Sequence, residues 1–465
     1  MAPIDPAMRC SAVIPCHNGV DLTAACIESL LRLDGRPDLE ILVVDNASED
    51  GTKDLGDLSP RVRVLRQERN LGFAGGVNAG VRAATAPHLL ILNNDTQAAP
   101  SMLSELTRAL ASHPDLAAVA PVANDVRGEA QMPFGNIGRD ATGRGRIAAA
   151  LAEHPPLQDV DYLSGLCLLV PRATFELVGL FDERFGFGNF EDDDFSLRLR
   201  LRGKRLGIAR RAYLHHEGHA TFRAMGLDLG AEIDARRQQF AAKWRHDPAG
   251  AAVLAALRGD VQAAGAAAEV ARRRWPQWID AEWHLARAAA ARGQHHLAIT
   301  HFEALLRANP RHSSAATEAL VQRLAVDDEG GAVRLLEHMR DGCYLSPEQM
   351  ARIFTRFGLH YRDRGDRATA LEQFRAALEF EPTNGELHNW IGVCTLDDDL
   401  DAAQRAFTMA VERGCALGHT NLGIVFHRRG DLARAAHHFT CAAAELPDDP
   451  IVAANLSALR ELAPV

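Results

Sequence analysis

The chain has 465 residues, of which 47% are hydrophobic and 24% are charged, and its formal net charge is −10. These values are ordinary for a globular protein, and the length allows roughly two to four domains, each with its own core. The negative charge argues against nucleic acid as the main partner, because there is no broad basic excess to displace counterions.

Eight cysteines are spread along the chain without a C-x-x-C pair or a zinc-finger spacing, which predicts reduced and mostly buried thiols. The first residues show no basic segment followed by an apolar one, so we expect no signal peptide. The longest apolar runs fall far short of the roughly 20 residues that cross a bilayer, so we expect no transmembrane segment. These features predict a cytoplasmic protein, with a peripheral position at the inner face of the membrane as a further option.

Up to about residue 245, short apolar runs alternate with segments of helical length. The expected strands cover 11–15, 40–45, 61–65, 88–95 and 116–121, and the expected helices include 21–33, 75–85 and 100–112. This alternation predicts an α/β domain whose mostly parallel sheet is covered on both faces. Ligands of such sheets bind beyond the carboxyl ends of the strands, and Asp45 and Asp95 are expected at that edge.

Both of these acids also allow simpler interpretations. Asp45 follows the strand in ILVVDNASEDGT and could cap the next helix, and Asp95 in LLILNNDT could be a turn residue. A hard divalent cation, however, binds well to one carboxylate plus the phosphates of a substrate, which favours a functional role for Asp95.

A glycine-rich stretch, NLGFAGGVNAG, covers residues 70–80. Its glycines let the backbone approach a ligand closely, and N–H groups at a helix start suit a phosphate. The chain contains neither G-x-G-x-x-G nor the phosphate-binding G-x-x-x-x-G-K-[ST], which argues against an oxidoreductase and a P-loop nucleotidase.

Four carboxylates stand in a row from Glu191 to Asp194, within the stretch GNFEDDDFSLRLRLRG. A solvated acidic turn is one interpretation. The residues that follow alternate with a period of two, which indicates a strand, whereas acids first, arginines last and a closing glycine favour a helix. In a helix, one acid could project into a cleft with a raised pKa and serve as a base.

From about residue 246 the sequence becomes alanine-rich and helical, and a repeat with a spacing of 32 to 37 residues appears. The repeat units are anchored at Gly259, Gly293, Gly365 and Gly430, with weaker units at Gly330 and Asp398. Alanine follows each of the four stronger anchors after five residues and proline after seventeen. The pattern resembles the tetratricopeptide repeat (TPR), which implies about six helix pairs stacked into a solenoid with a peptide- or protein-binding concave face. An unrelated helical bundle is the alternative.

Several motifs of the first half occur together and in a fixed order. They are IPCHN, VVDNASEDGT, NLGFAGGVN, LNNDT, YLSGLCLLVPRATFELVGLFDERF and FEDDDFSLRLRLRG. Over residues 10–222 the chain thereby resembles the family-2 glycosyltransferases of GT-A fold, especially the rhamnosyltransferase-like branch. The resemblance implies a Rossmann-like GT-A domain over 1–245 followed by an all-α TPR domain over 246–465, and it makes the segment after the acids a helix.

The resemblance also implies a reaction and a set of site residues. The reaction is an inverting transfer of a sugar from a nucleotide-diphosphate donor to an acceptor. The implied nucleotide-sugar-binding residues are Asn18, Asp45, Asn46, Asn70, Gly72, Asn78 and Asn94, with Ser48 nearby. Asp95 would hold Mg²⁺ or Mn²⁺, helped by a histidine of HHEGHAT, where His216 fits the spacing better than His215 and His219 is a further option. Many relatives carry an acid where this chain has Asn93.

Asp192 takes the position of the catalytic base, which would deprotonate the acceptor hydroxyl. Glu191 and Asp194 are expected to orient that base or contact the acceptor. Repulsion among the clustered acids would raise the pKa of the base, and the helix start would limit the cost. The Gly-, Arg- and Pro-rich residues 124–156 are expected to form a loop that covers the donor or acceptor.

The acceptor remains open at this point. Repeats of this kind usually bind proteins, so a protein or peptide recruited by the TPR domain is one candidate, and a surface polysaccharide or lipid-linked saccharide is the other. A scaffold that has lost catalysis is an alternative of another class, which the presence of Asp45, Asp95 and Asp192 argues against. No motif encodes the sugar or the base of the donor.

Overall fold

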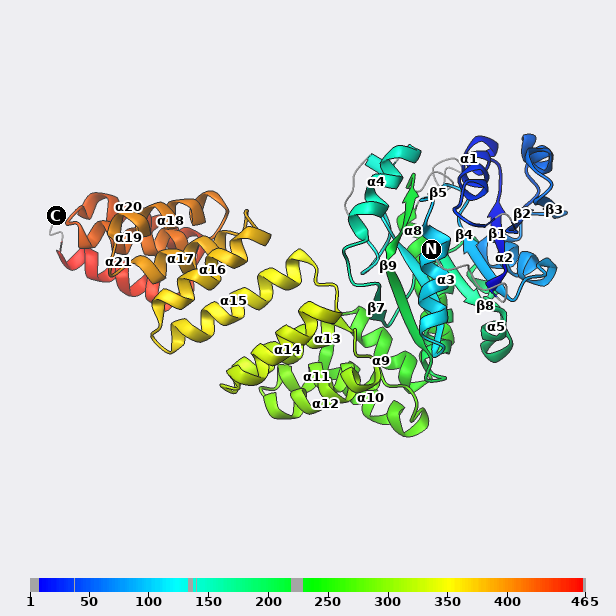
Figure 1. The fold of residues 1–465 in the computed structure, drawn as a ribbon. Coiled ribbons are helices and arrows are strands. Elements are labelled where there is room, and N and C mark those ends of the chain that lie inside the picture. The colour runs from blue at the N-terminus through cyan, green and yellow to red at the C-terminus, as the bar shows by residue number, and fades with distance from the viewer. Residues whose placement is uncertain (1–7, 37, 133–136, 139, 219–228, 463–465) are drawn as a thin grey trace. The chain divides into compact units, whose positions relative to one another are not determined.

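The computed structural model describes residues 8–36, 38–132, 137–138, 140–218 and 229–462 (Figure 1). The chain divides into two compact units. Unit 1 contains Met1–Ala316 and Glu337–Tyr344, and unit 2 contains Thr317–Leu336 and Leu345–Val465. Among the described residues, no helix is both long and apolar enough to cross a membrane.

Unit 1 is built on a sheet whose first half is parallel. Its strands are β1 (Cys10–Cys16), β2 (Glu40–Asp45), β3 (Val62–Arg66) and β4 (His88–Leu92), in the order β3-β2-β1-β4. All three pairings are parallel, as the alternation of strands and helices predicts. Asp45 is the last residue of β2 and Asp95 follows β4 after a short turn, so both acids lie at the predicted edge.

The second half of the sheet is mixed. It contains β5 (Thr96–Ala98), β6 (Leu116–Ala123), β7 (Leu157–Val160), β8 (Cys167–Pro171) and β9 (Arg205–His216). β8 joins the two halves because it runs antiparallel to both β4 and β6. The long strand β9 is parallel to β6 and antiparallel to β5 and β7. Of this half, the sequence patterns predicted only β6.

Helices cover both faces of the sheet. On one face lie α1 (Val20–Leu31) and α3 (Met102–Ser112), and on the other lie α2 (Gly72–Ala83), α4 (Ala141–Leu151), α5 (Arg172–Val178) and α6 (Glu191–Arg200). Successive residues of β1 point into different cores, because Ala12 and Ile14 belong to the first and Val13 to the second. Two short 3₁₀ segments, η2 (Gly51–Leu58) and η4 (Glu183–Phe185), complete this part of the chain.

The first helices after the sheet belong to the same compact unit. They are α8 (Leu229–Trp244), α9 (Pro248–Leu257), α10 (Val261–Arg274), α11 (Ala281–Ala291) and α12 (His295–Ala308). A third core joins them to the sheet domain, since Leu197 of α6 packs in it with Phe240 of α8 and with Trp278. The predicted boundary at residue 245 therefore lies inside this unit.

Polar contacts reinforce this junction. Arg200, at the end of α6, donates from Nε to Asp280 Oδ2 at 2.9 Å, and both side chains are buried. The Nε2 atom of buried His312 lies 3.2 Å from Asp161 Oδ1. Asp159 of β7 accepts the backbone N–H of Arg311 at 3.0 Å. The first repeats are thus held to the transferase-like domain by a core and by buried charges.

The remaining helices are α13 (Ser313–Ala325) and α14 (Glu329–Gly342), followed in unit 2 by α15 (Pro347–Asp363), α16 (Arg367–Phe380), α17 (Gly385–Thr395), α18 (Leu400–Glu412), α19 (Leu417–Arg428), α20 (Leu432–Glu445) and α21 (Pro450–Leu462). From α15 to α21, each helix packs against the next (Figure 1). A helical region of this kind confirms the predicted all-α solenoid with TPR units.

Glycine and phenylalanine residues of the repeats pack closely against each other. A Cβ atom placed on Gly358 would lie 2.6 Å from the ring of Phe374, and the same clash occurs between Gly392 and Phe407 at 2.4 Å. In these pairs of helices, a glycine of the first helix leaves the room that the phenylalanine of the second helix fills.

One anchor was placed wrongly. Gly330 lies in the first turn of α14, whereas the residue with left-handed backbone between α13 and α14 is Asp327, with φ 58°. Asp328 then caps α14, because its Oδ1 accepts the N–H of Gly331 at 2.9 Å. Counting five residues from Asp327 leads to Ala332, which is fully buried like the alanines of the other units. The pattern was missed because aspartate replaces the expected glycine.

Candidate functional site

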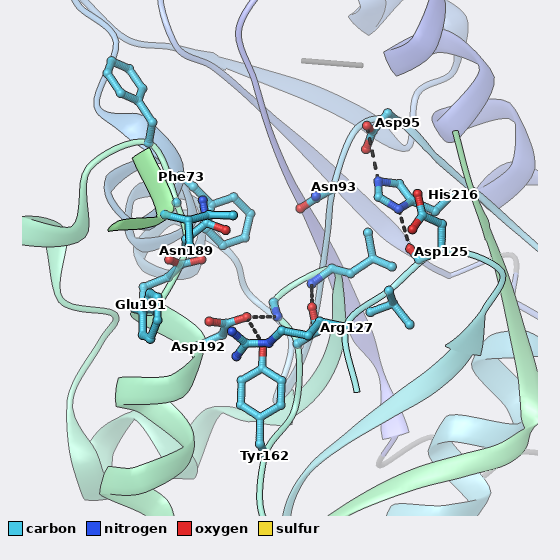
Figure 2. Close-up of a pocket in the computed structure, with 18 of the residues that line it drawn as sticks. Phe73, Asn93, Asp95, Asp125, Arg127, Tyr162, Asn189, Glu191, Asp192 and His216 are labelled. Carbon is cyan, nitrogen blue, oxygen red and sulfur yellow. Dashed lines mark hydrogen bonds and ion pairs between the residues drawn. The ribbon is translucent and has the colours of Figure 1, made fainter. Parts of the chain in front are cut away.

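A large cavity, here called the main cavity, opens at the carboxyl edge of the sheet and has a volume of about 550 Å³ (Figure 2). The lining residues that matter below are Asp95, Asp125, Arg127, Tyr162, Gly165, Phe187, Glu191, Asp192, His216 and Arg237. Asp95 and Asp192 are about 100 residues apart in the sequence but line this same cavity. The shared cavity on which the sequence hypothesis depends is therefore present.

Asp95 and His216 are brought together by strand pairing. β5 starts directly after Asp95, and its first residue, Thr96, is paired with His216 of β9. The Nε2 atom of His216 lies 3.4 Å from Asp95 Oδ2, and Nδ1 lies 2.6 Å from the carbonyl oxygen of Asp125. A carbonyl only accepts, so Nδ1 carries a proton and Nε2 is the atom that faces Asp95. Burial lowers the pKa of His216, but the Asp95 carboxylate outweighs burial and raises it above its usual value.

These two residues suit a divalent cation that is completed by other ligands. Asp95 Oδ1 is buried and has no hydrogen-bond partner, which leaves an oxygen ligand available. Within the part of the chain that the structure describes, no group of three or more His, Cys, Asp or Glu residues could hold a metal ion. Mg²⁺ commonly uses one or two protein ligands together with substrate phosphates, so the residues fit that mode of binding.

His215, the other histidine of the motif that the structure describes, does not line the main cavity. His215 is paired with Gln97, and its Nδ1 lies 3.3 Å from the hydroxyl of Tyr213. His219 lies outside the described residues. Of the histidines that the structure describes in this motif, His216 is the one that reaches Asp95.

The row of acids begins a helix, as the family resemblance predicted. α6 starts at Glu191, and the two residues before it, Asn189 and Phe190, have φ values of 74° and 68°. From the first turn of the helix, Glu191 and Asp192 line the wall of the main cavity. Non-glycine residues with such backbone angles are strained, and strain of this kind is concentrated at functional sites.

The Asp192 carboxylate is fixed by three hydrogen bonds. Its Oδ2 accepts from the hydroxyl of Tyr162 at 2.6 Å and from the N–H of Gly165 at 2.9 Å. Its Oδ1 accepts the N–H of Asp193 at 2.9 Å and has a further lone pair for a substrate. The orientation of this side chain is therefore set by groups from two segments.

Glu191 and Asp194 differ sharply from each other. Glu191 is 4% exposed, lines the main cavity and has no hydrogen-bond partner on Oε2. Burial and then the charge of Asp192 raise the pKa of Glu191 well above its usual value. Asp194 is fully buried away from the cavity, where it accepts from Arg198 Nε and Trp244 Nε1, each at 2.8 Å. The structure therefore does not bring Asp194 to the site, and the contacts explain it as a structural residue.

Arg127 is a cavity residue that the sequence patterns did not single out. It donates two hydrogen bonds to the Asp193 carboxylate, at 2.7 and 2.8 Å. Its guanidinium also lies over the ring of Tyr162, 4.5 Å from the centroid. Arg127 thereby joins the segment after β6 to α6 and to the tyrosine that contacts Asp192.

A smaller cavity, here called the side cavity, adjoins the main one and has a volume of about 80 Å³. Both cavities share Phe73, Asn93 and Phe187. Of the predicted nucleotide-binding residues, Asn46, Asn70, Gly72 and Asn94 line the side cavity.

Contacts of Asn46 and Gly72 determine the shape of the side cavity's wall. Asn46 Nδ2 donates to the carbonyl of Gly72 at 3.1 Å, and Asn46 Oδ1 is buried without a partner. Gly72 has φ 73°, and a Cβ atom there would lie 2.1 Å from the carbonyl oxygen of Gly186. Only glycine fits at this position.

Three other predicted nucleotide-binding residues line neither cavity, namely Asn18, Asp45 and Asn78. Asn18 Oδ1 accepts the N–H of Glu49, and Asp45 is held by Arg66 at 2.5 Å and by the N–H of Ser48 at 2.8 Å. Asn78 bonds the backbone of Phe181 in both directions, at 2.9 and 3.0 Å. In the structure these side chains shape the loops around the site.

The segment predicted to be a covering loop, 124–156, is partly helical. Ala141–Leu151 forms α4, which packs into the core of the sheet, so the expectation of a continuous loop was wrong. Its first part does line the main cavity through Asp125, Val126 and Arg127. Residues 133–136 and 139 lie outside the described residues. A covering role for the segment remains a prediction.

Comparisons with known proteins agree with this architecture. A family model described as Glycosyl transferase family 2 matches residues 11–150, and one described as Tetratricopeptide repeat matches residues 397–450. The chain is 30% identical over 227 residues to the N-acetylglucosaminyl-diphospho-decaprenol L-rhamnosyltransferase of Mycobacterium tuberculosis, an alignment that covers 42% of this chain and 71% of that protein.

Two further similarities are more distant. The O-antigen biosynthesis protein RfbC of Myxococcus xanthus is 27% identical over 239 residues, which cover 48% of this chain and 18% of that protein. A crystal structure of S. aureus TarS aligns with a TM-score of 0.38 and 14% identity over 72% of this chain and 93% of that one. Because the mycobacterial relative is 30% identical and is matched over 71% of its length, this chain belongs to glycosyltransferase family 2, with an α/β sheet domain followed by tetratricopeptide repeats.

Proposed function

We propose that the chain transfers a sugar from a nucleotide-diphosphate sugar to a hydroxyl acceptor, with inversion at the anomeric carbon. The observation that carries this proposal is the position of Asp95 with His216 and of Asp192 on the wall of one cavity. An inverting transfer needs two functions at opposite sides of a sugar, one that stabilises the leaving diphosphate and one that accepts a proton. The two groups of residues supply these functions.

The donor is proposed to bind with its nucleoside in the side cavity. Amide side chains of Asn46, Asn70 and Asn94 line that cavity, and the buried Oδ1 of Asn46 has no partner of its own. A buried acceptor without a partner is costly unless a ligand supplies a donor. We propose that Asp45, Asn18 and Asn78 affect nucleotide binding indirectly, because their hydrogen bonds fix the loops around the site.

Asp95 and His216 are proposed to hold Mg²⁺ or Mn²⁺ at the junction with the donor diphosphate. The bound cation would supply positive charge to the leaving diphosphate. Asp95 contributes an oxygen ligand, and the Nε2 atom of His216 faces the same point. The hydrogen bond of Nδ1 to the Asp125 carbonyl orients this imidazole.

Asp192 is proposed as the base. Its Oδ1 takes the proton of the acceptor hydroxyl while the hydroxyl oxygen bonds to the anomeric carbon and the diphosphate departs from the opposite face. The hydrogen bonds from Tyr162 and Gly165 keep Oδ2 occupied, which leaves Oδ1 for the acceptor. A single displacement of this kind inverts the configuration.

For the acceptor, two observations point in different directions. The names of the mycobacterial and Myxococcus relatives describe work on a lipid-linked saccharide and on an O-antigen, so we propose a saccharide hydroxyl, free or lipid-linked, as the acceptor. The tetratricopeptide match favours a protein or peptide bound by the repeats, as the second candidate acceptor or as a partner that brings the enzyme to its acceptor. A scaffold without catalysis is the alternative of another class.

Mass spectrometry of the products formed by the purified chain from a panel of nucleotide sugars tests the proposal. We expect turnover that EDTA removes, and a loss of about 10²–10⁴-fold in Asp192→Asn with nucleotide binding kept. Asp54→Asn, at an exposed acid of η2, is the control and should leave turnover unchanged. Equal turnover of Asp192→Asn and the wild type would contradict the base assignment, and absence of turnover with every donor would favour the scaffold.

A further inference from the structure

We propose that Glu191 acts as a neutral carboxylic acid that donates a hydrogen bond to an oxygen atom of the bound sugar substrate, beside the Asp192 carboxylate. The inference rests on the proposed function, because it requires a sugar in the main cavity. It gives Glu191 a role as a donor that an ionised carboxylate does not have.

The two carboxyl groups receive very different hydrogen bonding. Asp192 accepts three hydrogen bonds, from Tyr162, Gly165 and Asp193, and each of them stabilises the charged form. Glu191 is 4% exposed, and its Oε2 is buried without any hydrogen-bond partner. An ionised carboxylate in such a place would lose its hydration without compensation, whereas a neutral one costs much less to bury.

The position of Glu191 directs its carboxyl group into the cavity. A Cβ atom on Gly165 would lie 3.5 Å from Glu191 Oε1, and one on Gly188 would lie 4.0 Å from it. Two glycines thus flank the carboxyl group, and no side chain from either position covers it. Figure 2 shows Glu191 on the same wall of the cavity as Asp192. A substrate that fills the cavity meets both groups.

Three charged groups act on Glu191, namely Asp192 and Asp193 on α6 and Arg127 after β6. Tyr162 before β8 and Arg237 on α8 are further titratable or charged residues in the lining of the same cavity. Neither arginine is committed to Glu191, because Arg127 is bound by both oxygens of Asp193 and Arg237 lies 3.0 Å from Asp234. Burial and the neighbouring charge of Asp192 both favour the protonated form, and they raise the pKa of Glu191.

Asp192 and Glu191 therefore have different roles, the first as a proton acceptor and the second as a hydrogen-bond donor. Asp192 receives hydrogen bonds from three donors, whereas Glu191 Oε2 receives none, and two carboxyl groups in such different surroundings can take different roles. Asp192 accepts the proton of the attacking hydroxyl, and the O–H of Glu191 donates to a hydroxyl or ring oxygen and so orients the sugar. The substrate class that fits this arrangement is a neutral, hydroxyl-rich ring.

Infrared difference spectroscopy of the full chain tests the protonation state without requiring activity. The spectrum at pH 7 of the wild type minus Glu191→Gln should contain the C=O stretch of a protonated carboxyl group. Glu40→Gln is the matched control, because Glu40 accepts hydrogen bonds from Ser11 and Thr85 that lower its pKa, and its removal should change only carboxylate bands. Absence of the protonated band from the Glu191 difference would overturn the inference.

Steady-state kinetics test the donor role. Glutamine keeps an N–H donor at this position, so Glu191→Gln should lose at most about threefold in kcat/KM, whereas Glu191→Ala should lose about tenfold or more. Equal losses in the two variants would overturn the donor role. A loss in Glu191→Gln as large as that in Asp192→Asn would show that the negative charge is needed, which also overturns the inference while the proposed function stands. Absence of turnover in the wild type would instead refute the proposed function, and the infrared result would still decide the protonation of Glu191.

Discussion

The orientation of Asp192 depends on a residue outside its own helix. The hydroxyl of Tyr162 donates to Oδ2 at 2.6 Å, and the ring of Tyr162 lies beneath the guanidinium of Arg127. Arg127 in turn is bound by Asp193, the next residue of α6. These contacts connect Tyr162, Arg127 and α6 around the Asp192 carboxylate, so that each side chain restricts the movement of the next.

Replacement of Tyr162 by phenylalanine should slow the transfer without weakening donor binding. The variant loses one hydrogen bond to Asp192, the proposed base, worth about 1 kcal/mol, and kcat should fall about fivefold while KM for the donor is unchanged. Tyr361→Phe is the matched control, because its hydroxyl donates to Glu329 at 2.6 Å in unit 2, and it should keep full kcat. A rise in the donor KM with unchanged kcat would contradict a positioning role for Tyr162.

At the scale of single residues, the sequence motifs predicted two acids that line the main cavity, but they did not predict the contacts of those acids. Asp95 and Asp192 stand in short motifs whose order is informative, and both line the main cavity. Tyr162 and Arg127 come from segments distant in the chain, and only the folded sheet brings them to Asp192. Asp194 was expected at the site because it is adjacent in sequence, but the helical rotation turns it toward Trp244.

At the scale of elements, α6 connects the site to the repeats. Asp192 lies in its first turn and Arg200 at its end, where the guanidinium pairs with Asp280. Close by, His312 lies 3.2 Å from Asp161, which also faces Arg200 at 3.6 Å. The junction of the sheet domain with the first repeats is therefore a buried network of charges.

The charge of His312 should make stability depend on pH. Burial lowers its pKa, but the Asp161 carboxylate outweighs burial and raises the pKa to about 9. Because the pKa is raised above the usual value of about 6.5, the stabilisation is complete below pH 6.5 and is lost between about 6.5 and 9. The free energy of unfolding, measured with denaturant, should fall over this range.

His312→Gln supplies the control for this prediction. The variant cannot titrate at this position, so the difference in unfolding free energy between it and the wild type should shrink as the pH rises from 6.5 to 9. A difference that stays constant over that range would show that His312 does not carry the charge in the folded state.

The patterns of the sequence predicted the elements of the parallel half of the sheet and missed most of the mixed half. β1, β2 and β4 are apolar runs, which is typical of buried parallel strands, whereas the edge strand β3 carries two arginines and is only partly buried. β9 has the sequence RLGIARRAYLHH and is mostly buried. Its arginines and histidines interrupt the apolar pattern from which a buried strand is predicted. β5 and β7 are too short to show a period.

At the scale of the whole molecule, the first repeats belong to the compact unit that contains the site. A chain cut after residue 250 would lose Asp280 and Trp278, and it would expose apolar side chains of the third core that remain, such as Leu197 and Phe240. Burial of one such side chain contributes roughly 1.5–3 kcal/mol, so the loss of their cover is destabilising. The fragment 1–250 should therefore unfold at a much lower temperature than the fragment 1–344.

Thermal unfolding and donor turnover of both fragments check this prediction. The fragment 1–344 keeps the partners of α6 and should retain turnover with a small saccharide acceptor. Comparable melting temperatures for the two fragments would contradict the structural role of the junction. Loss of a protein acceptor but not of a saccharide acceptor in 1–344 would show that the later repeats select protein.

Repeats that contact only the adjacent repeats can be duplicated, deleted or exchanged between genes as whole units. Within unit 2, such shuffling needs only a glycine opposite each phenylalanine, as at Gly358 and Phe374. The segment around Asp280 is constrained further, because any replacement must also bring an acid to Arg200 at the end of α6. Recombination should therefore be tolerated mainly late in the chain, between the repeats of unit 2. The early repeats should be inherited together with the sheet domain.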